Sequence, residues 1–228
     1  MSAAVVLLSG GLDSTVSLAL AAGECSSLHA LSFAYGQRHA RELECARWQA
    51  RRWKAREHRI IQLDFGSWAK SALTGHGAVP RDGEPSGAIP PTYVPARNTV
   101  LLAYALAWAE VLEAPRIYIG ANAVDYSGYP DCRPEFLDAF QALANLATRA
   151  AIEGRLRFEI RAPLLQLSKA EIVRLGQRLA VDFGHTHSCY DPGAEGAACG
   201  ACDACRLRLQ GFAAAGLADP LAPAGASG

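Results

Sequence analysis

The sequence predicts an α/β protein, built on a doubly wound parallel sheet and carrying a small cysteine-rich lobe near its C-terminus. Strand-like and helix-like segments alternate along most of the chain, which is the pattern of a parallel sheet covered by helices. The first strand-like segment, 3–8, is apolar throughout, as expected for a central strand buried on both faces. With 228 residues, of which 50% are hydrophobic, the chain can bury one sizeable core. Such sheets bind ligands beyond the carboxyl ends of their strands.

The N-terminal half is expected to form three strands with helices between them. The predicted order is a strand at 3–8, a Gly-Gly turn, a helix over 14–22, a strand over 28–35, a helix over 41–56 and a strand over 58–63. The helix over 41–56 has an arginine-rich outer face. An RNA contact is one interpretation of that face, but its glutamates and the neutral chain favour an ordinary solvated surface. Residues 65–95 are rich in Gly, Pro and Ser and predict a long loop of the kind that forms lids or binding elements.

The C-terminal half continues the alternation. The predicted order is a helix over 98–112, a strand over 116–120, a polar loop over 121–134, a helix over 135–153, a strand over 158–162 and a helix that follows Ser168. The helix over 98–112 is apolar nearly all round, so we expect it to be buried. Ser168 and Glu171 have the spacing of a capping box. Residues 219–228 are mainly Ala, Pro and Gly, and we expect a disordered tail there.

Composition narrows the classes of partner. The 22 basic residues balance 22 acidic ones, so no net field favours nucleic acid or an anionic membrane. We therefore expect a small-molecule substrate, with no nucleic acid and no membrane. No basic segment precedes the first apolar run, and no apolar stretch is long enough to span a bilayer, which predicts a cytoplasmic protein. In that setting, the seven cysteines indicate a metal or chemistry instead of disulfides.

A glycine-rich loop stands between the first strand and the first helix, with the sequence Ser9-Gly10-Gly11-Leu12-Asp13-Ser14. Free amides and the positive end of the helix dipole make such a position a site for anionic phosphate. The loop lacks the Gly-x-x-x-x-Gly-Lys spacing that places a lysine on the terminal phosphates of ATP, so cleavage elsewhere on the nucleotide is expected. The alternative is an ordinary turn in which Asp13 or Ser14 caps the helix.

Four of the cysteines are close in sequence and predict a metal site. Cys189, Cys199, Cys202 and Cys205 form Cys-x9-Cys-x2-Cys-x2-Cys, compact enough for four thiolates to meet one tetrahedral zinc. A redox dithiol and unliganded core cysteines are the alternatives. With four sulfur ligands no coordination position remains for water, so the predicted zinc is structural, one per chain.

A polar loop over 120–136 concentrates carboxylates, an arginine, an amide and two tyrosines after a predicted strand. Such groups suit a purine-like base, read by hydrogen bonds and stacking, and a carboxylate held by charge. As composition alone, a polar surface loop is an equally good interpretation.

As a string of residues, the same loop resembles the substrate loop of the 7-cyano-7-deazaguanine synthases, the QueC family. Further segments agree in order, namely 9–14, 35–39, 94–98, 163–164 with 167–172, and 188–190 with 199–205. The loop at 9–14 is itself similar to the pyrophosphate loop of the N-type ATP pyrophosphatases, which cut ATP between the α and β phosphates. The resemblance covers nearly the whole chain before the tail and implies an adenine nucleotide α-hydrolase-like fold.

The resemblance implies a reaction and a set of site residues. It implies conversion of 7-carboxy-7-deazaguanine and ammonia to 7-cyano-7-deazaguanine, in queuosine biosynthesis, with ATP and magnesium, by a homodimer. Catalytic roles fall on Asp13, which would help hold magnesium, and on Arg97 and Lys169, which would neutralise phosphate charge. The ATP phosphates would be surrounded by Leu8, Ser9, Gly10, Gly11, Leu12, Asp13, Ser14, Thr15, Val16, Ser17 and Leu18. The deazaguanine and its carboxylate would be positioned by Asn122, Asp125, Tyr126, Ser127, Asp131, Arg133 and Glu135.

The implied organisation is an ATP-binding domain over 1–183, a zinc lobe over 184–218 and the tail over 219–228. The chain departs from the family pattern at Ala96, where glycine is usual, and at His187, where tryptophan is usual. Alanine has less backbone freedom, so the geometry beside Arg97 is expected to differ. Rival functions are attachment of a deazapurine to a protein or another amine, a tRNA-modifying pyrophosphatase, and a non-catalytic nucleotide-binding zinc module.

Overall fold

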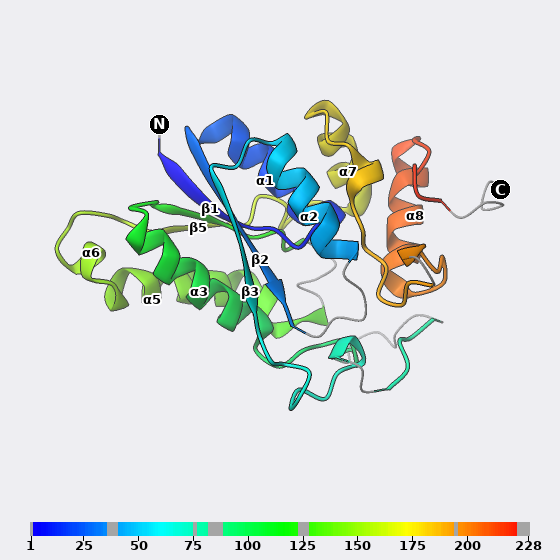
Figure 1. Ribbon diagram of the computed structural model, residues 1–228, viewed down its shortest axis with the longest axis horizontal. Helices are drawn as coiled ribbons and strands as arrows, with labels where there is room; N and C mark the ends of the chain where they lie inside the picture. The colour runs from blue at the N-terminus through cyan, green and yellow to red at the C-terminus, as the bar shows by residue number, and fades with distance from the viewer. Residues whose placement is uncertain are drawn as a thin grey trace.

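A five-stranded parallel sheet forms the centre of the protein (Figure 1). The computed structural model describes residues 2–35, 41–74, 77–81, 89–122, 128–193 and 196–222. The strands are β1 (Ala3–Leu7), β2 (Ser27–Ala34), β3 (Glu57–Gln62), β4 (Arg116–Tyr118) and β5 (Glu159–Arg161). Their order in the sheet is β3-β2-β1-β4-β5, and every neighbouring pair is parallel. The predicted α/β class with a parallel sheet is confirmed.

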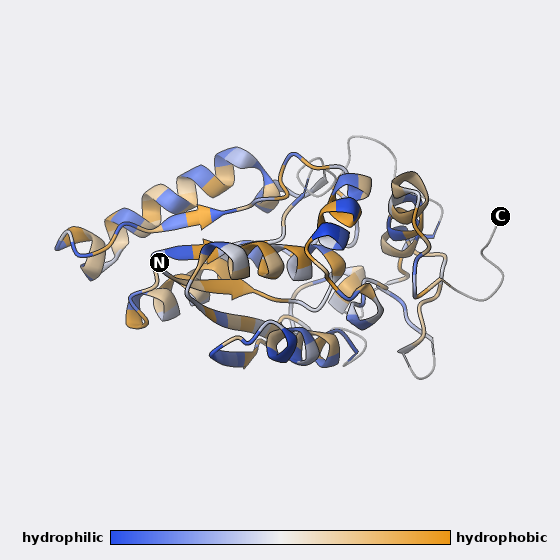
Figure 2. Ribbon diagram, turned by 90° about the horizontal axis from the view of Figure 1, so that it is seen from above, coloured by the Kyte–Doolittle hydropathy of each residue, from blue (hydrophilic) through white to orange (hydrophobic). Residues whose placement is uncertain are grey.

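Helices cover both faces of the sheet. They are α1 (Leu12–Glu24), α2 (Arg41–Arg52), α3 (Arg97–Val111), α5 (Pro134–Ala147), α6 (Arg149–Ile152), α7 (Lys169–Arg178) and α8 (Asp203–Ala215), with 3-10 turns η1 (Ala72–Thr74), η2 (Pro130–Cys132) and η3 (Phe183–His185). Along β1, Ala4 and Val6 pack with α1 and α2, while Val5 and Leu7 pack with α3 and α5. This is why β1 is an uninterrupted apolar run. Figure 2 shows orange apolar strands between helices that are striped blue and orange.

The strand order reverses between β1 and β4. β1 continues to β2 and β3 on one side, and β4 continues to β5 on the other, so their carboxyl ends flank a crevice. Gly120 follows β4 and lies against the start of α1, where a Cβ atom would be 2.9 Å from the backbone nitrogen of Ser14. The loops after β1 and β4 therefore meet at the place where a doubly wound sheet binds its ligand.

Three predicted helices differ in detail. The helix expected over 41–56 ends at Arg52, and the helix expected over 135–153 is divided into α5 and α6 by Thr148, whose backbone is extended. Thr148 donates its hydroxyl to the carbonyl of Ala144 at 2.8 Å and so closes α5. The expectation of a fully buried helix over 98–112 is wrong for one side, because Tyr104 is 45% exposed and Val111 is 80% exposed.

The long segment over 65–95 is less irregular than its composition suggests. In its described part, Phe65, Ala69, Leu73 and Val94 form a small apolar cluster of their own around η1. Among the described residues, no helix is both long and apolar enough to cross a bilayer.

The C-terminal helices extend the core beyond the sheet. Side chains of α1 and α7, among them Val16 and Ile172, share an apolar cluster with Phe183 and with Phe212 of α8. Arg208 of α8 forms a buried ion pair with Asp219 at 2.8 Å and also donates to the Thr186 hydroxyl at 2.7 Å. Asp219 was expected to open the disordered tail. Instead its side chain is buried in the ion pair with Arg208 of α8, and residues 223–228 lie outside the described residues.

Candidate active site

A cavity of about 260 Å³ opens at the carboxyl ends of the central strands. Its lining includes the loop after β1, the end of β2, the start of α3 and residues 187–190 next to the cysteines. Lys169 of α7 and Arg208 of α8 also reach its wall. The segments that the sequence singled out for phosphate and metal binding thus converge on one cavity. All three predicted catalytic side chains, Asp13, Arg97 and Lys169, line it as well.

The loop after β1 is shaped to receive an anion at the start of α1. Gly10 has φ +93° and lies so close to the carbonyl oxygen of Glu42 on α2 that a side chain would not fit. The Ser9 hydroxyl accepts from the amide of Gly11 at 3.1 Å and lies 3.0 Å from the Ser14 hydroxyl. The first amide in the helical ladder is that of Thr15, and no described side chain caps α1, so the amides of its first turn remain available to a ligand.

Asp13 and Lys169 form an ion pair at the mouth of this loop. The Lys169 ammonium donates to both carboxylate oxygens of Asp13, at 2.9 and 2.7 Å. Ser168 and Glu171 form the predicted capping box, which fixes the start of α7 and therefore the origin of the Lys169 side chain. Gly211 of α8 lies against the Lys169 stem so closely that an added Cβ atom would collide with its Cγ atom. The cysteine lobe thus holds one predicted catalytic residue in place.

Arg97 begins α3 and extends into the cavity beside aromatic hydroxyls. Its guanidinium donates to the Tyr35 hydroxyl at 3.4 Å and lies 5.9 Å from the centre of that ring. Burial lowers the pKa of Arg97, but the combined effect of Tyr35, Tyr190 and Tyr129 raises it by more than burial lowers it. The net pKa is therefore above its usual value and the side chain is charged. The preceding Ala96 has φ +51°, a left-handed conformation in which glycine is favoured. Alanine therefore adopts the geometry that glycine permits, with a strain of about 1 kcal/mol.

The predicted substrate residues are distributed more widely. The Asp131 carboxylate accepts from the Asn98 backbone amide at 2.8 Å, so it fixes the start of α3 beside Arg97. Asn122 is buried after β4, whereas Arg133 and Glu135 are exposed where α5 begins. None of these four side chains lines the described part of the cavity. Asp125, Tyr126 and Ser127 lie outside the described residues.

Several cavity residues were not predicted as site residues. Glu42 on α2 is the most important, because burial raises its pKa to about 7, against the opposing effect of Arg97. Tyr129 and Tyr190 add aromatic surface, and the Tyr129 hydroxyl lies 2.8 Å from that of Thr92. The His187 amide donates to the carbonyl of Gly10 at 2.9 Å, which ties the cysteine lobe to the phosphate loop. In the sequence, Glu42 looks like part of a solvated helix face, and only its contact with Gly10 distinguishes it.

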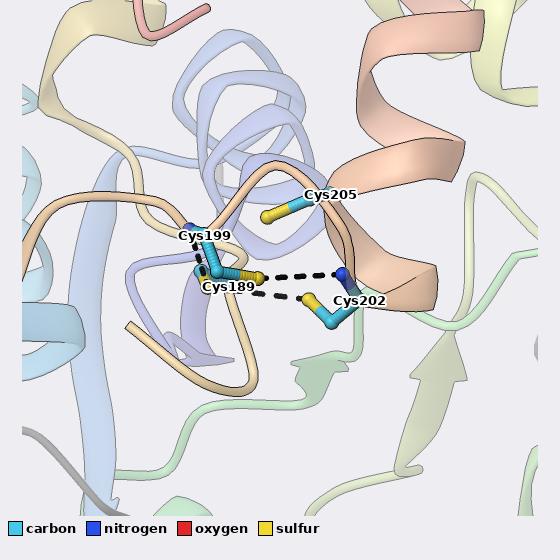
Figure 3. Close-up of side chains that lie close together, drawn as sticks. All are labelled: Cys189, Cys199, Cys202 and Cys205. Atoms are coloured by element: carbon cyan, nitrogen blue, oxygen red, sulfur yellow. Dashed lines mark hydrogen bonds between the residues drawn. The ribbon is translucent and has the colours of Figure 1, made fainter. Parts of the chain in front are cut away.

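The four cysteines come together as the spacing predicted (Figure 3). Their sulfur atoms all lie within 4.8 Å of one another, and those of Cys189 and Cys202 are 3.9 Å apart. A tetrahedron with metal–sulfur bonds of about 2.3 Å has edges of about 3.8 Å, so the donor set fits one metal ion. The amides of Cys199 and Cys202 donate to the sulfurs of Cys189 and Cys199, each at 3.3 Å, and stabilise thiolates. Hydrogen bonds within the cluster lower the pKa of Cys202 and raise the pKa values of Cys189 and Cys205. His187 is not in the cluster.

A family model described as "Queuosine biosynthesis protein QueC" matches residues 3–216. The chain belongs to the QueC family. A relative in Geobacter metallireducens, named 7-cyano-7-deazaguanine synthase, is 60% identical over 219 residues, which are 96% of this chain and 92% of the relative. A protein of the same name in Pelobacter propionicus is 57% identical over 97% of this chain and 98% of its own length. QueC membership therefore extends over nearly the whole chain, including the phosphate loop and the four cysteines.

Solved structures support the fold of this QueC chain. NMN synthetase from Francisella tularensis superposes with a TM-score of 0.53 at 16% identity, covering 95% of this chain and 78% of that one. A predicted subunit of a tRNA methyltransferase from Methanocaldococcus jannaschii has a TM-score of 0.50 at 18% identity, covering 78% and 75%. At these identities the likeness concerns architecture alone.

Proposed function

We propose that this chain is an ATP-dependent 7-cyano-7-deazaguanine synthase, which converts 7-carboxy-7-deazaguanine and ammonia to the nitrile. The observation that carries this proposal is the uncapped start of α1, which opens into the same cavity as the Asp13–Lys169 pair and Arg97 in a chain of the QueC family. A site for phosphate oxygens, two cations and aromatic surface for a flat base are then adjacent.

The chemistry requires activation of a carboxylate, because its oxygen is a poor leaving group. Transfer of AMP to that oxygen lets it leave as a phosphate ester. In this proposal the amides of the α1 start and the Ser9 and Ser14 hydroxyls hold the departing pyrophosphate. Lys169 and Arg97 offset charge that develops on the α-phosphate, and preorganised charge of this kind is usually a large term in catalysis. Asp13 orients Lys169 and, in this proposal, would also help hold magnesium.

We further propose that the four-cysteine cluster holds one structural zinc ion. Zinc prefers four tetrahedral thiolates, and such a site has no position for water or substrate. Zinc would connect residues 189–202 to the start of α8, whose Gly211 packs on Lys169. The metal's contribution to activity would then be indirect, through the placement of one cation.

A cytoplasmic homodimer is the assembly that we propose for this chain. The exposed side of α3 carries an apolar stripe that includes Tyr104 and Val111, and Leu146 and Ile152 on α5 and α6 are 75% and 69% exposed. A hydrogen bond of 2.9 Å from the Ala150 amide to Glu110 holds α6 against α3, so these residues form one surface. A second copy would cover it. We expect a particle of twice the 24.2 kDa chain mass in light scattering, and a monomer would contradict this assembly.

Labelling the carboxylate oxygens tests the proposed function. The carboxylate has two oxygens and the nitrile has none, and an unactivated amide loses water slowly. We therefore expect two rounds of adenylation, the first giving the amide and the second the nitrile. With both carboxylate oxygens labelled by oxygen-18, mass spectrometry should find two labelled AMP molecules for each nitrile formed.

The amide gives the matched control for this experiment. Supplied alone, without ammonium, unlabelled 7-amido-7-deazaguanine should be converted to the nitrile. This conversion should consume one ATP and release one unlabelled AMP. Products of ADP and phosphate, or label released into water, would contradict adenylation at this loop. Absence of any nitrile would contradict the proposed function itself.

A further inference from the structure

Glu42 is a carboxylate of the cavity that neither the phosphate chemistry nor the metal site uses. It is the second residue of α2 and lines the cavity together with the loop after β1. The backbone of Glu42 is in close contact with Gly10, which places the start of α2 against the phosphate loop. The side chain also lies within the electrostatic influence of Arg97 at the start of α3.

The titratable groups around Glu42 come from every wall of the cavity. Tyr35 follows β2 and Arg97 begins α3, and the wider lining adds Asp13, Tyr129, Cys132, Lys169, His187, Cys189, Tyr190 and Arg208. The cavity has two described carboxylates, and both oxygens of Asp13 accept from Lys169. Among the described residues, no hydrogen bond or ion pair joins the Glu42 carboxylate to another side chain. Glu42 thus differs from Asp13, whose two oxygens are paired with Lys169.

The proposed reaction needs a proton acceptor. Ammonia carries three N–H bonds and a nitrile nitrogen carries none, so three protons leave the nitrogen during one conversion. One leaves as attacking ammonia displaces AMP, one as the amide oxygen takes up AMP, and one as the resulting imidate expels AMP. The best acceptor has a pKa near the working pH, because it is then both deprotonated and basic enough to take the proton.

We propose that Glu42 is the general base that accepts these protons, an assignment that rests on the proposed function. The reacting carbon, once joined to the α-phosphate, must lie between the phosphate loop and the tyrosine side of the cavity. The backbone of Glu42 contacts the loop at Gly10, and its carboxylate acts electrostatically on Tyr35. In each step an N–H bond breaks, its electron pair stays on nitrogen to form the C–N π bond or displace AMP, and the Glu42 carboxylate gains the proton. The proton passes to solvent before the next step.

The environment of Glu42 suits this role. Burial destabilises its charged form and raises the pKa to about 7, while Arg97 limits the rise. Below pH 7 the carboxyl is mostly protonated and cannot accept a proton, and above pH 7 it is mostly ionised. Activity that depends on Glu42 should therefore rise with pH and level off above about 7.

The conversion of the amide to the nitrile isolates this step, because it uses no ammonia and is unaffected by the titration of ammonium. For the wild type we expect log(kcat/KM) for the amide to rise with unit slope below pH 7 and to level off above it. For Glu42→Gln, which keeps shape and removes basicity, we expect kcat to fall by about 10²-fold or more, with the acid limb of the profile lost. Glu42→Asp should restore the limb in part.

Glu44→Gln is the matched control, because Glu44 lies on the same helix but faces solvent and pairs with Arg41 at 3.0 Å. It should match the wild type. Melting temperature and bound zinc should be the same in all variants, and Glu42→Asp serves if the Gln variant does not fold. An unchanged kcat in Glu42→Gln would overturn the proposal, as would a raised KM with the acid limb intact, which would make Glu42 a binding residue. Failure of the wild type to convert the amide would instead contradict the proposed function.

Discussion

Replacement of Lys169 by alanine is expected to lower kcat for AMP release by about 10²- to 10³-fold, the loss typical of one preorganised group that offsets developing charge. Its ammonium lies at the mouth of the phosphate loop, and its side chain is only 16% exposed, so water replaces it poorly. The Asp13 carboxylate left behind lies in the first turn of α1, where the helix dipole favours negative charge. The fold should therefore persist, and kcat measured at saturating ATP should show the loss.

Two further variants sharpen this prediction. Lys54→Ala removes an exposed lysine beyond the far end of α2 and should leave turnover unchanged. Gly211→Ala keeps the Lys169 charge but places a methyl group against its stem, so turnover should fall although no charge is lost. If Lys169→Ala retained wild-type turnover, Lys169 would have no part in the chemistry, and the capping box would serve α7 alone.

The strands and the phosphate loop were predictable because local sequence determines them. An apolar run followed by two glycines and a helix has few other solutions, and Gly10 does adopt the positive φ that its position requires. The cysteine cluster was predictable for the same reason, since short spacings limit where four sulfur atoms can lie. These features depend on residues that are neighbours in the chain.

Features that depend on distant contacts were not predictable. Glu42 belongs to a helix whose pattern indicates a solvated face, and its place in the cavity follows from packing of α2 against Gly10. Asp131 looks like a ligand residue in its polar loop, yet its carboxylate binds the amide of Asn98. In each case a tertiary contact determines the role of the residue.

The exposure of one side of α3 was also not predictable from the local sequence. A helix that is apolar nearly all round is expected to be buried, and within one chain only part of its surface is covered. The sequence pattern does not distinguish burial by the same chain from burial by a second one. The exposed Tyr104 and Val111 are therefore an argument about assembly as much as about the fold.

Cys202→Ser is expected to cause the largest loss of stability. Zinc binding to four thiolates contributes about 10–16 kcal/mol to small zinc domains, which is comparable to the whole stability of a typical protein, about 5–15 kcal/mol. Serine is a preferred residue at helix N-caps, and Cys202 occupies the N-cap of α8, so this substitution preserves the cap and removes the ligand. Metal analysis should show well below one zinc per chain, and the melting temperature should fall.

The consequence should reach the active site through α8. Without the metal, α8 is held against α7 by packing and by the hydrogen bond from Arg174 to the Ala214 carbonyl near the far end of α8, so Gly211 should confine Lys169 less tightly. We therefore expect the residual folded protein to show reduced kcat for AMP release. Cys45→Ser is the control, because Cys45 is also buried but lies on α2 outside the cluster, and it should retain one zinc per chain. A Cys202→Ser protein with a full zinc complement and unchanged melting temperature would show that this cluster does not hold the metal, and full activity in a zinc-free protein would separate the lobe from catalysis.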